Sequence, residues 1–592
     1  MDFKIKLAPS FERKSTFYLP NDSAVPAGLE TTGLQKPDLS CFPYPLPSKK
    51  SEYTGELRVG PVRWLAASTG LTRYEPEAAF ESDIIQYFSA TRDLADNEVL
   101  ALCPDGADGV WVRTKTAVTH IEMIKTGARE KAELLREESL RYVDRRGMLS
   151  ERYLSVPRVL DSRVPYHHSD NDGGFTAAFA LGEMFRYAVL RREKGVDAPE
   201  TKQALAETLR HFDACMLLCY ICGRGDGFVA RTCQTRDEPI PDAGIFFRRQ
   251  ANGKAKCLVT TQSVEEGMAG VEVDCSHPIP ERFRKPYTDL GYDDDDMIFK
   301  TDTSSDEITL HLVHLYFANE ILVPDCPEIA PYIKETVSAI VGHIVDHGFR
   351  LCNCLGRSTT WAKWNEEYFN TPLGWPDGPL NCAEMLSYLL IASAVTGEVR
   401  WEKVYKELLE RGYADTMLEH GSRYTVNAKI ENVTVWEYIM YGDHMLATCA
   451  HWMLCLLEKD ADLRALYEES YRQWRTSMAR EHNACYDLTY LLSVPGAENE
   501  VDAEALAVWF RRTNLSNLTC SVRFEERHDV AVTTGKLGDK AITTLLPPDE
   551  RSITKYDRNP FCDDPGSPHR LESCYTYTFA YWLGKYSGLI ED

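Results

Sequence analysis

Carboxylate, imidazole and amide side chains are concentrated in the segment PYHHSDNDGG, at 165–174, directly before a long apolar stretch. Asp and Asn commonly cap the free N–H groups at the start of a helix, but one cap uses only one such residue. Because the segment offers more than a cap needs, we predict that it also faces a ligand. The alternative is that it only caps the helix at the surface. The side chains concerned are Tyr166, His167, His168, Asp170, Asn171 and Asp172.

A second group of polar side chains lies in KTDTSSDEITLHLVH, at the start of another apolar helix. Ser304 and Glu307 have the spacing of a capping box, which is the structural interpretation. Glu307, His311 and His314 follow at i, i+4 and i+7 and therefore share one helical face. A polar face on an otherwise apolar helix indicates a cavity, so Asp306 and Glu307 are candidates for a general acid or base, with His311 as a substrate contact. No fourth ligand completes a metal site, and we expect no metal.

Three tryptophans lie close together in GRSTTWAKWNEEYFNTPLGWPDGPLNCAE, a segment that we expect to be a long loop. The apolar face of a sugar ring packs on indole, and the indole N–H can donate a hydrogen bond. Trp361 and Trp364 are therefore candidate sugar contacts, with Trp375 nearby. The alternative is that these side chains attach the loop to the body of the protein.

Several single residues give weaker signals. Asn381 shares a helical face with Glu384, although Asn381 also suits an N-cap. His444 and His451 are seven residues apart on one helical face, and His451 reads as a core histidine. Arg231, in GRGDGFVARTC, could hold a carboxylate through two parallel hydrogen bonds. We include Asn381, His444 and Arg231 among the candidate substrate contacts.

The elements that must position these residues are mostly helices. From about residue 126 onward the apolar spacing is helical, with roughly eleven or twelve helices joined by short turns that contain Gly or Pro. Successive helices of this kind pack as antiparallel hairpins, and six hairpins can close into an (α/α)6 toroid. The longer inserts, 222–300 and 351–380, would lie on one rim, where loops carry function. An open solenoid is the alternative, but the helices show no regular repeat.

The N-terminal part has a different pattern. Residues 1–55 are rich in Pro, Ser and Lys and predict an extended surface arm. Residues 56–125 contain a weak repeat in which Trp64 aligns with Trp111, an offset of 111 − 64 = 47 positions. Each copy predicts a β-hairpin, and a period of this length resembles a propeller blade. Two copies cannot close a propeller, so we predict a small β-module packed on a helical catalytic domain at 126–592.

Composition limits the partners of the chain. Its 66 basic and 90 acidic residues give a formal net charge of −24, which disfavours nucleic acid as a ligand. The first residues lack the apolar core of a signal peptide, and no run of roughly 18 apolar residues predicts a membrane span. We therefore expect a cytoplasmic protein whose 18 cysteines are reduced, with no membrane partner. Homo-oligomer formation stays open.

Five motifs together carry a resemblance that covers roughly residues 160–590. The motifs are SDNDGG, GFVARTC, KTDTSSDEI, STTWAKWNEEYFN and YWLGKYSGLI. They resemble a group of bacterial six-hairpin glycosidase-like proteins that often carries propeller-like repeat pieces, and the nearest named family is glycoside hydrolase family 154, the exo-β-glucuronidases. The resemblance implies a toroid with the site at its funnel end. It also implies that Asp172, Asp306 and Glu307 face the sugar, beside Trp361 and Trp364.

The favoured hypothesis is hydrolysis of an oligosaccharide or glycoside without a cofactor. Two carboxylates would flank the scissile bond, one with a raised pKa as the acid and one as base or nucleophile. We expect Asp172 to pair with Asp306 or Glu307. Arg231 and Lys300 would bind the carboxylate of a uronic acid, so the substrate would be an anionic carbohydrate.

Two other functions remain open at this point. A polysaccharide lyase on a similar toroid would use Tyr166 or His168 to abstract the proton beside a uronate carboxylate that Arg231 and an Asn neutralise. A non-catalytic helical binding protein would have His168, Asp172, Glu307 and Trp361 scattered in space. Lyase action produces an unsaturated sugar that absorbs ultraviolet light, so one absorbance trace separates it from hydrolysis.

Overall fold

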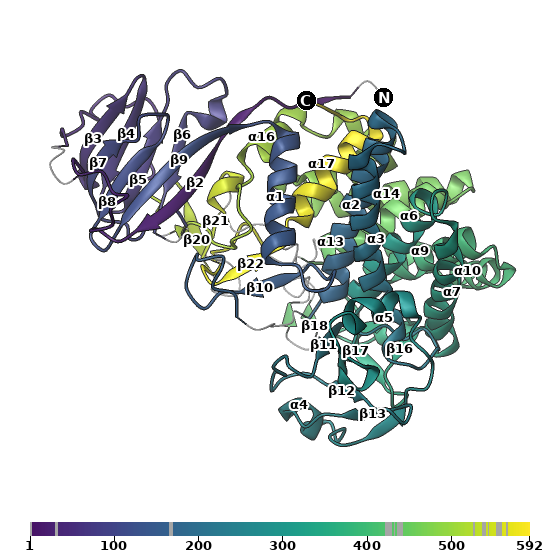
Figure 1. Cartoon of the computed structure of the whole chain (residues 1–592). Helices are drawn as coiled ribbons and strands as arrows, with labels where there is room; N and C mark the ends of the chain where they lie inside the picture. Colours follow the sequence, from purple (N-terminus) through teal and green to yellow (C-terminus); the bar gives the residue numbers. More distant parts are fainter. Residues whose placement is uncertain are drawn as a thin grey trace.

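The computed structural model of the chain separates a β-rich N-terminal part from a larger helical part (Figure 1). The mainly helical class predicted from the sequence agrees with this arrangement. The N- and C-termini lie side by side, because β1 (Ile5–Lys6) pairs in parallel with β23 (Ile590–Glu591). The structure describes residues 3–29, 34–90, 92–164, 170–420, 429–430, 433–434, 442–524, 527–534, 540–542, 544–551, 559–563 and 566–592.

Two four-stranded antiparallel sheets form the N-terminal part. One has the order β3-β4-β5-β6 and the other the order β2-β9-β8-β7. Apolar side chains from both sheets share one core, so the sheets pack face to face as a sandwich. The strands are β2 (Ser10–Tyr18), β3 (Tyr53–Val59), β4 (Val62–Ala67), β5 (Gly70–Tyr74), β6 (Ile85–Phe88), β7 (Val99–Pro104), β8 (Val110–Thr114) and β9 (Val118–Thr126).

The sandwich differs from the predicted pair of propeller-like repeats. Both hairpins exist, as β4–β5 and β8–β9, but their tryptophans face opposite ways. Trp64 is fully buried between the sheets, whereas Trp111 is partly exposed and stacks on His120. In a strand a shift of one residue exchanges the two faces, so aligning the tryptophans places the second copy out of register. The neighbours Val110 and Val112 take the inward positions instead.

The predicted extended arm at 1–55 is largely part of this sandwich. β2 pairs with β9 along its whole length, from Ser10 opposite Thr126 to Tyr18 opposite Val118. The β-structure therefore begins well before the expected boundary at residue 56. Its pairing partner lies more than 100 residues further along the chain, which a local pattern cannot reveal.

The opposite orientation of the two tryptophans has a measurable consequence. Trp64→Phe should cost about 1–2 kcal/mol of unfolding free energy, because the smaller ring leaves a cavity between the sheets. Trp111→Phe should change it by less than about 0.5 kcal/mol, since the side chain is partly exposed. Urea unfolding of both variants checks this, and equal losses would contradict the inward and outward assignment.

The helical part contains a closed ring of packed helices. Contacts lead from α2 to α6, α9, α13, α15 and α17, and from α17 back to α2. In the sequence, each of these inner helices alternates with a helix that packs outside the ring. The inner helices are α2 (Asp172–Lys194), α6 (Ser305–Ile321), α9 (Gly378–Thr396), α13 (Asp443–Leu457), α15 (Ala484–Ser493) and α17 (Tyr575–Ser587). The outer helices are α1 (Ala128–Tyr142), α3 (Pro199–Tyr220), α7 (Ala330–Asp346), α10 (Val399–Glu410), α14 (Ala461–Met478) and α16 (Ala503–Arg512).

Burial explains which helices lie inside. α2, α9 and α13 have buried side chains around most of their circumference, as expected for helices surrounded by other helices. α9 is even long and apolar enough to cross a membrane, but 83% of its most apolar window is buried within the protein. Outer helices such as α10 bury one face only. Since each outer helix returns antiparallel, the inner helices all point the same way and their N-termini meet at one end of the ring.

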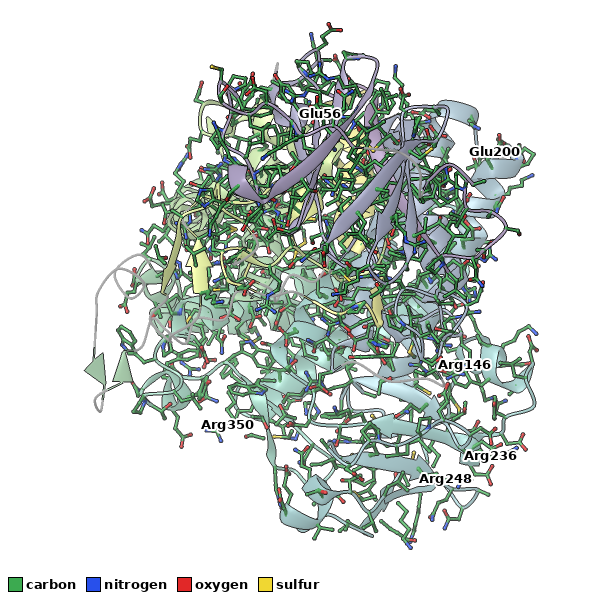
Figure 2. All side chains as sticks on the ribbon, turned by 90° about the vertical axis from the view of Figure 1, so that its left-hand side faces the viewer. Glu56, Arg146, Glu200, Arg236, Arg248 and Arg350 are labelled. Atoms are coloured by element: carbon green, nitrogen blue, oxygen red, sulfur yellow. The ribbon has the colours of Figure 1, made fainter. Side chains whose placement is uncertain are left out.

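Two insertions lie next to the start of α6. The first is a five-stranded sheet with the order β11-β15-β12-β13-β14, and Figure 2 labels Arg236 and Arg248 on it. The second is the hairpin of β16 (Arg350–Cys352) and β17 (Ser358–Lys363). The sheet strands are β11 (Thr232–Thr235), β12 (Phe246–Arg249), β13 (Lys254–Cys257), β14 (Glu272–Asp274) and β15 (Met297–Lys300). All 18 cysteines are free thiols.

Candidate functional site

The N-terminal ends of three inner helices carry polar residues that do not act as caps. Asn171, Ser304 and Asp377 occupy the N-cap positions of α2, α6 and α9. Within the described chain, none of their side chains accepts a hydrogen bond from its own helix. The capping box expected for Ser304 and Glu307 is therefore wrong. These side chains instead make tertiary contacts at the end of the ring.

Arg231 joins two of these helix ends. Its Nη2 donates to Asn171 Oδ1 at 2.8 Å and to Ser304 Oγ at 3.2 Å, and its Nη1 donates to the Asp302 carbonyl at 3.1 Å. The guanidinium is buried and lies just before β11. Arg231 thus holds the start of α2 against the start of α6. Its predicted role in binding a substrate carboxylate is weakened, because most of its N–H groups are already used.

Asp172, the first residue of α2, is anchored by the protein itself. Its Oδ2 accepts hydrogen bonds from Arg145 at 3.2 Å and from the Thr232 hydroxyl. Its side chain is only 2% exposed. Asp172 therefore ties α2 to β11 and to the chain that follows α1, and neither Arg145 nor Thr232 was predicted from the sequence.

Glu307 lies directly behind the start of α2 in a fully buried position. A Cβ on Gly173 would come within 2.3 Å of Glu307 Oε2 and 2.6 Å of His311 Cε1, so the two helices meet at a glycine. Burial raises the pKa of Glu307 well above its ordinary value, while Arg231 lowers it and Asp172 raises it further. Asp172 and Glu307 thus lie near enough for the charge of Asp172 to act on Glu307, and both side chains are buried.

Gly173→Ala tests this close approach. The added methyl group has no space between Glu307, His311 and Leu218, so we expect a loss of about 1–3 kcal/mol of stability. Gly195→Ala is not a fair control because Gly195 has a positive φ. Gly342, which has an ordinary φ and no atom within 3.6 Å of its Cβ position, provides one. Thermal unfolding of both variants measures the difference, and an unchanged Gly173→Ala protein would contradict the packing.

Glu384 forms a second buried carboxyl group, on α9. Its Oε1 accepts a hydrogen bond from Thr309 at 2.8 Å, and its Oε2 accepts one from Trp364 Nε1 at 2.8 Å. Burial raises the pKa of Glu384 to about 8, and the nearby charges of Asp306 and Asp377 raise it too. Trp364 is fully buried, so its predicted role as a sugar contact is wrong.

Asp377 is the carboxyl group at the start of α9, and it is only half-buried. The Tyr368 hydroxyl donates to its Oδ2 at 2.5 Å. Burial raises the pKa of Asp377 to about 6, although the hydrogen bond from Tyr368 lowers it. Asp377 was not among the predicted residues, because WPDGP reads as an ordinary turn and helix start, in which the acid is explained as a cap.

Asp306 is the other half-buried acid of the site, in the first turn of α6. Ser304 Oγ donates to its Oδ2 at 2.6 Å. Its charge acts on both buried carboxyls, since it raises the pKa of Glu307 and that of Glu384. Asp306 thus acts on a buried acid of its own helix, Glu307, and on one of α9, Glu384, and Asp377 acts on Glu384 as well.

The rim beside these acids carries an exposed aromatic side chain. Trp361, on β17, is 48% exposed. Its neighbour Thr360 donates from its N–H to Asp302 Oδ1 at 2.9 Å, which attaches the hairpin to the loop before α6. Asp302 has a positive φ of 63°, a strained conformation for a residue other than glycine. Lys300 pairs with Asp170, whose side chain is 64% exposed.

Other predicted residues do not join this group. His311 is buried behind Glu307, with its Nδ1 bonded to the Glu307 carbonyl. Asn381 is buried and donates from Nδ2 to the Lys363 carbonyl at 2.8 Å. His444 packs against Trp474 and Tyr486 in a separate aromatic cluster. Each of these three side chains is enclosed by protein. The predictions for Tyr166, His167 and His168 concern positions outside the described residues.

The described residues contain no group of three or more His, Cys, Asp or Glu side chains placed to hold a metal ion. Arg145 and Arg231 are the cations nearest to Asp172 and Glu307.

Comparisons with known proteins give distant structural matches only. No protein-family model and no curated protein matches the chain. A glycoside hydrolase family 9 protein of Bacteroides ovatus is 8% identical, covers 89% of this chain and 96% of its own, and has a TM-score of 0.34. A metagenome-derived family 9 endoglucanase has 10% identity, 81% and 84% coverage, and a TM-score of 0.31. The catalytic domain of Clostridium thermocellum CelT has 11% identity, 72% and 83% coverage, and a TM-score of 0.29. At these TM-scores, the matches establish neither the fold nor the activity of this chain.

Proposed function

We propose that this protein is a glycoside hydrolase whose reacting carboxyl groups are Asp377 and Asp306. The supporting observation is that two half-buried acids at the starts of neighbouring helices both act on the buried Glu384, and that burial raises the pKa of one of them, Asp377, to about 6. Two carboxyl groups in unlike environments are what hydrolysis of a glycosidic bond requires. Asp377 would be protonated below about pH 6 and act as the acid.

In the proposed reaction, the Asp377 carboxyl gives its proton to the glycosidic oxygen as the bond to the anomeric carbon breaks. The Asp306 carboxylate either removes a proton from water that attacks that carbon or attacks the carbon itself. The distance between the two carboxyl groups with substrate bound decides which of these two routes is followed. A distance of about 5–5.5 Å gives retention of the configuration at the anomeric carbon, and about 6.5–9.5 Å gives inversion. When Asp306 attacks the carbon, a glycosyl ester forms, and water that gives its proton to the Asp377 carboxylate then cleaves this ester and restores both carboxyl groups.

This assignment replaces the originally expected pair of Asp172 with Asp306 or Glu307. Asp172 and Glu307 are almost completely enclosed, and Arg145 holds Asp172 in place. In the proposal they support the site from below: Asp172 fixes the start of α2, and Glu307 fills the contact between α2 and α6. Asp306 keeps its proposed role because it is the more exposed acid of α6.

The proposed substrate is a carbohydrate that packs on Trp361, whose indole is exposed at the rim. Specificity for a uronic acid rests only on the resemblance to glycoside hydrolase family 154. Lys300 is paired with Asp170 and Arg231 is bonded to Asn171, so an added carboxylate would compete with these partners. A matched pair of nitrophenyl β-glucoside and β-glucuronide tests the anionic preference.

The main experiment is a product-resolved screen of aryl glycosides and oligosaccharides. Hydrolysis releases a new reducing end with no ultraviolet absorbance, and this is the expected result. A lyase product would be an unsaturated uronate that absorbs ultraviolet light, and its appearance would contradict the proposal. Binding without turnover across the screen would favour the non-catalytic alternative. No contact among the residues that the structure describes favours a lyase.

The raised pKa of Asp377 gives a pH dependence. An acid must hold its proton to react, so kcat/KM should fall as the pH rises above about 6. Tyr368→Phe removes the hydrogen bond that lowers this pKa, so the falling limb should move to higher pH. Initial rates across pH 4–9 on one aryl glycoside measure both. A limb that stays in place in the variant would contradict the link between Tyr368 and the acid.

We also propose that the ring of inner and outer helices is an (α/α)6 toroid of the six-hairpin glycosidase type and forms the catalytic unit. The closed order of helix contacts supports this, as does the position of Asp306 and Asp377 at the starts of two inner helices. A cytoplasmic location remains part of the proposal. Cell fractionation with an antibody to the native protein tests it.

A further inference from the structure

A cavity of about 300 Å³ lies far from these acids, where the sandwich meets the helical part. Its walls come from β2 and β9, from α1 and from the segment 514–520. A concave site of this size is the usual form of a small-ligand pocket, and here polar and apolar residues share the lining about equally. The apolar lining includes Phe17, Ile124, Leu134, Leu135, Leu160, Leu515 and Leu518.

Arg92 gives this cavity a buried positive charge. Its side chain is almost enclosed, and Nη2 donates to the carbonyls of Cys520 at 2.6 Å and Arg551 at 2.8 Å. Its Nε and Nη1 are buried without a hydrogen-bond partner among the described residues. Burying a guanidinium without a carboxylate is costly, because carbonyl groups replace only part of its hydration.

Arg158 adds a second guanidinium to the lining. Its Nη1 donates to the Leu94 carbonyl at 3.0 Å and its Nη2 to the Ala90 carbonyl, while Nε has no partner in the described part of the chain. Its backbone has a φ of 65°, which costs energy in a residue other than glycine. Such strain is retained where the surroundings fix it, and ligand clamps are common places for it.

The local charge balance of the cavity is positive, although the whole chain carries −24. The lining has four cationic side chains, Arg13, Lys14, Arg92 and Arg158, against the two acids Asp93 and Glu138. Arg13 pairs with Asp93 at 3.1 Å, which removes one charge of each sign. Three cations then remain against Glu138 in the lining. Burial lowers the pKa of Arg92, while Asp93 and the nearby Asp549 raise it without bonding to Arg92. For Arg92 and Arg158, no carboxylate lies within ion-pair distance among the described residues.

We propose that this cavity binds a small organic acid, with its carboxylate on Arg92 and Arg158 and its apolar body against the leucine wall. A guanidinium recognises a carboxylate through paired, charge-assisted hydrogen bonds, which would satisfy the nitrogens that lack partners. Because the walls come from both the sandwich and the helices, bound ligand stabilises their junction by mass action. This site is independent of the proposed glycosidase activity.

Benzoate is the probe, with benzamide as its uncharged counterpart, on the full-length protein at constant ionic strength. Calorimetry should show that benzoate binds at one site, and benzoate should raise the unfolding temperature until the site is saturated. Benzamide should neither bind nor raise the unfolding temperature. Arg92→Met and Arg158→Met should each weaken benzoate binding at least about tenfold. Arg129→Met is the matched control, because Arg129 pairs with Glu193 outside the cavity. It should leave binding unchanged.

A variant that keeps both arginines distinguishes loss of the binding site from loss of folding. Leu134 lines the cavity and is 38% exposed, so Leu134→Trp can fill the space from its open side and should abolish binding. Benzamide binding as tightly as benzoate would overturn the proposal, since the cavity would then be apolar only. Inorganic phosphate binding more tightly than benzoate would overturn the role of the leucine wall. Equal weakening by Arg129→Met would show diffuse anion binding and reject the site.

Discussion

Replacing Asp377 with asparagine should lower kcat on an alkyl glycoside by about 100- to 10,000-fold, the usual contribution of a general acid. An amide cannot give a proton to the leaving oxygen, whereas the Asp377 carboxyl has a pKa raised to about 6 and keeps its proton in mildly acidic solution. The loss should be much smaller on a dinitrophenyl glycoside, because that leaving group needs no proton. Steady-state kinetics on the two substrates give the measurement.

The companion variant separates the two proposed roles. Asp306→Asn should lower turnover on both substrates, since a base or nucleophile is needed whatever the leaving group. Glu367→Gln is a suitable control, because Glu367 lies near Asp377 in sequence and its side chain is 81% exposed. Circular dichroism melts verify folding of all three proteins. Full activity of Asp377→Asn on the alkyl glycoside would remove Asp377 from the mechanism.

The helical pattern predicted which side chains of the site share a helix face, but it did not predict which of them are exposed. Glu307 and His311 do share one face of α6, as their spacing requires. That face lies against α2 rather than an open cavity, because Gly173 lets the helices approach closely. Sequence spacing defines which side chains share a face, but the neighbour that covers the face depends on packing between distant segments.

Two of the three tryptophans of the 356–384 segment illustrate a second limit. Trp361 and Trp364 were expected to act together because the segment reads as a loop. Part of it is the strand β17, and successive side chains of a strand alternate between its faces. A separation of three positions therefore places them apart: Trp361 is exposed and Trp364 is bonded to Glu384. Recognising the strand would have predicted this difference.

Asp377 was missed for a related reason. An acid just before Gly-Pro at a helix start has a sufficient explanation as a cap, and only coordinates reveal that its carboxyl makes no capping bond. Its raised pKa comes from burial, and its partner Tyr368 comes from the short helix before it. Sequence patterns can identify where polar groups lie, whereas their protonation depends on tertiary surroundings.

Arg13→Met should destabilise the protein by about 3–5 kcal/mol, the range measured when one member of a buried ion pair is removed. Arg13 lies on β2 and is almost fully buried, where it pairs with Asp93 and with Asp549. Methionine fills a similar volume but leaves the buried Asp93 without this partner. Asp549 lies in the segment after the last outer helix, so the ion pair of Arg13 with Asp549 connects the sandwich to the helical part. Arg129→Met removes a largely exposed pair and should cost less than about 1 kcal/mol.

The acid dependence of stability distinguishes a lost ion pair from a general packing defect. Burial alone would raise the pKa of Asp549, but Arg13 and Arg512 lower it well below its ordinary value. A carboxyl group with a lowered folded pKa stabilises the protein above its unfolded pKa of about 4, and this stability is lost as the pH falls further. In Arg13→Met the pKa of Asp549 should return toward its ordinary value. Urea unfolding should therefore show a smaller loss of stability between about pH 5 and pH 3 in the variant than in the unsubstituted protein. Parallel pH profiles would instead mean that Arg13 contributes through packing on Phe88 rather than through charge.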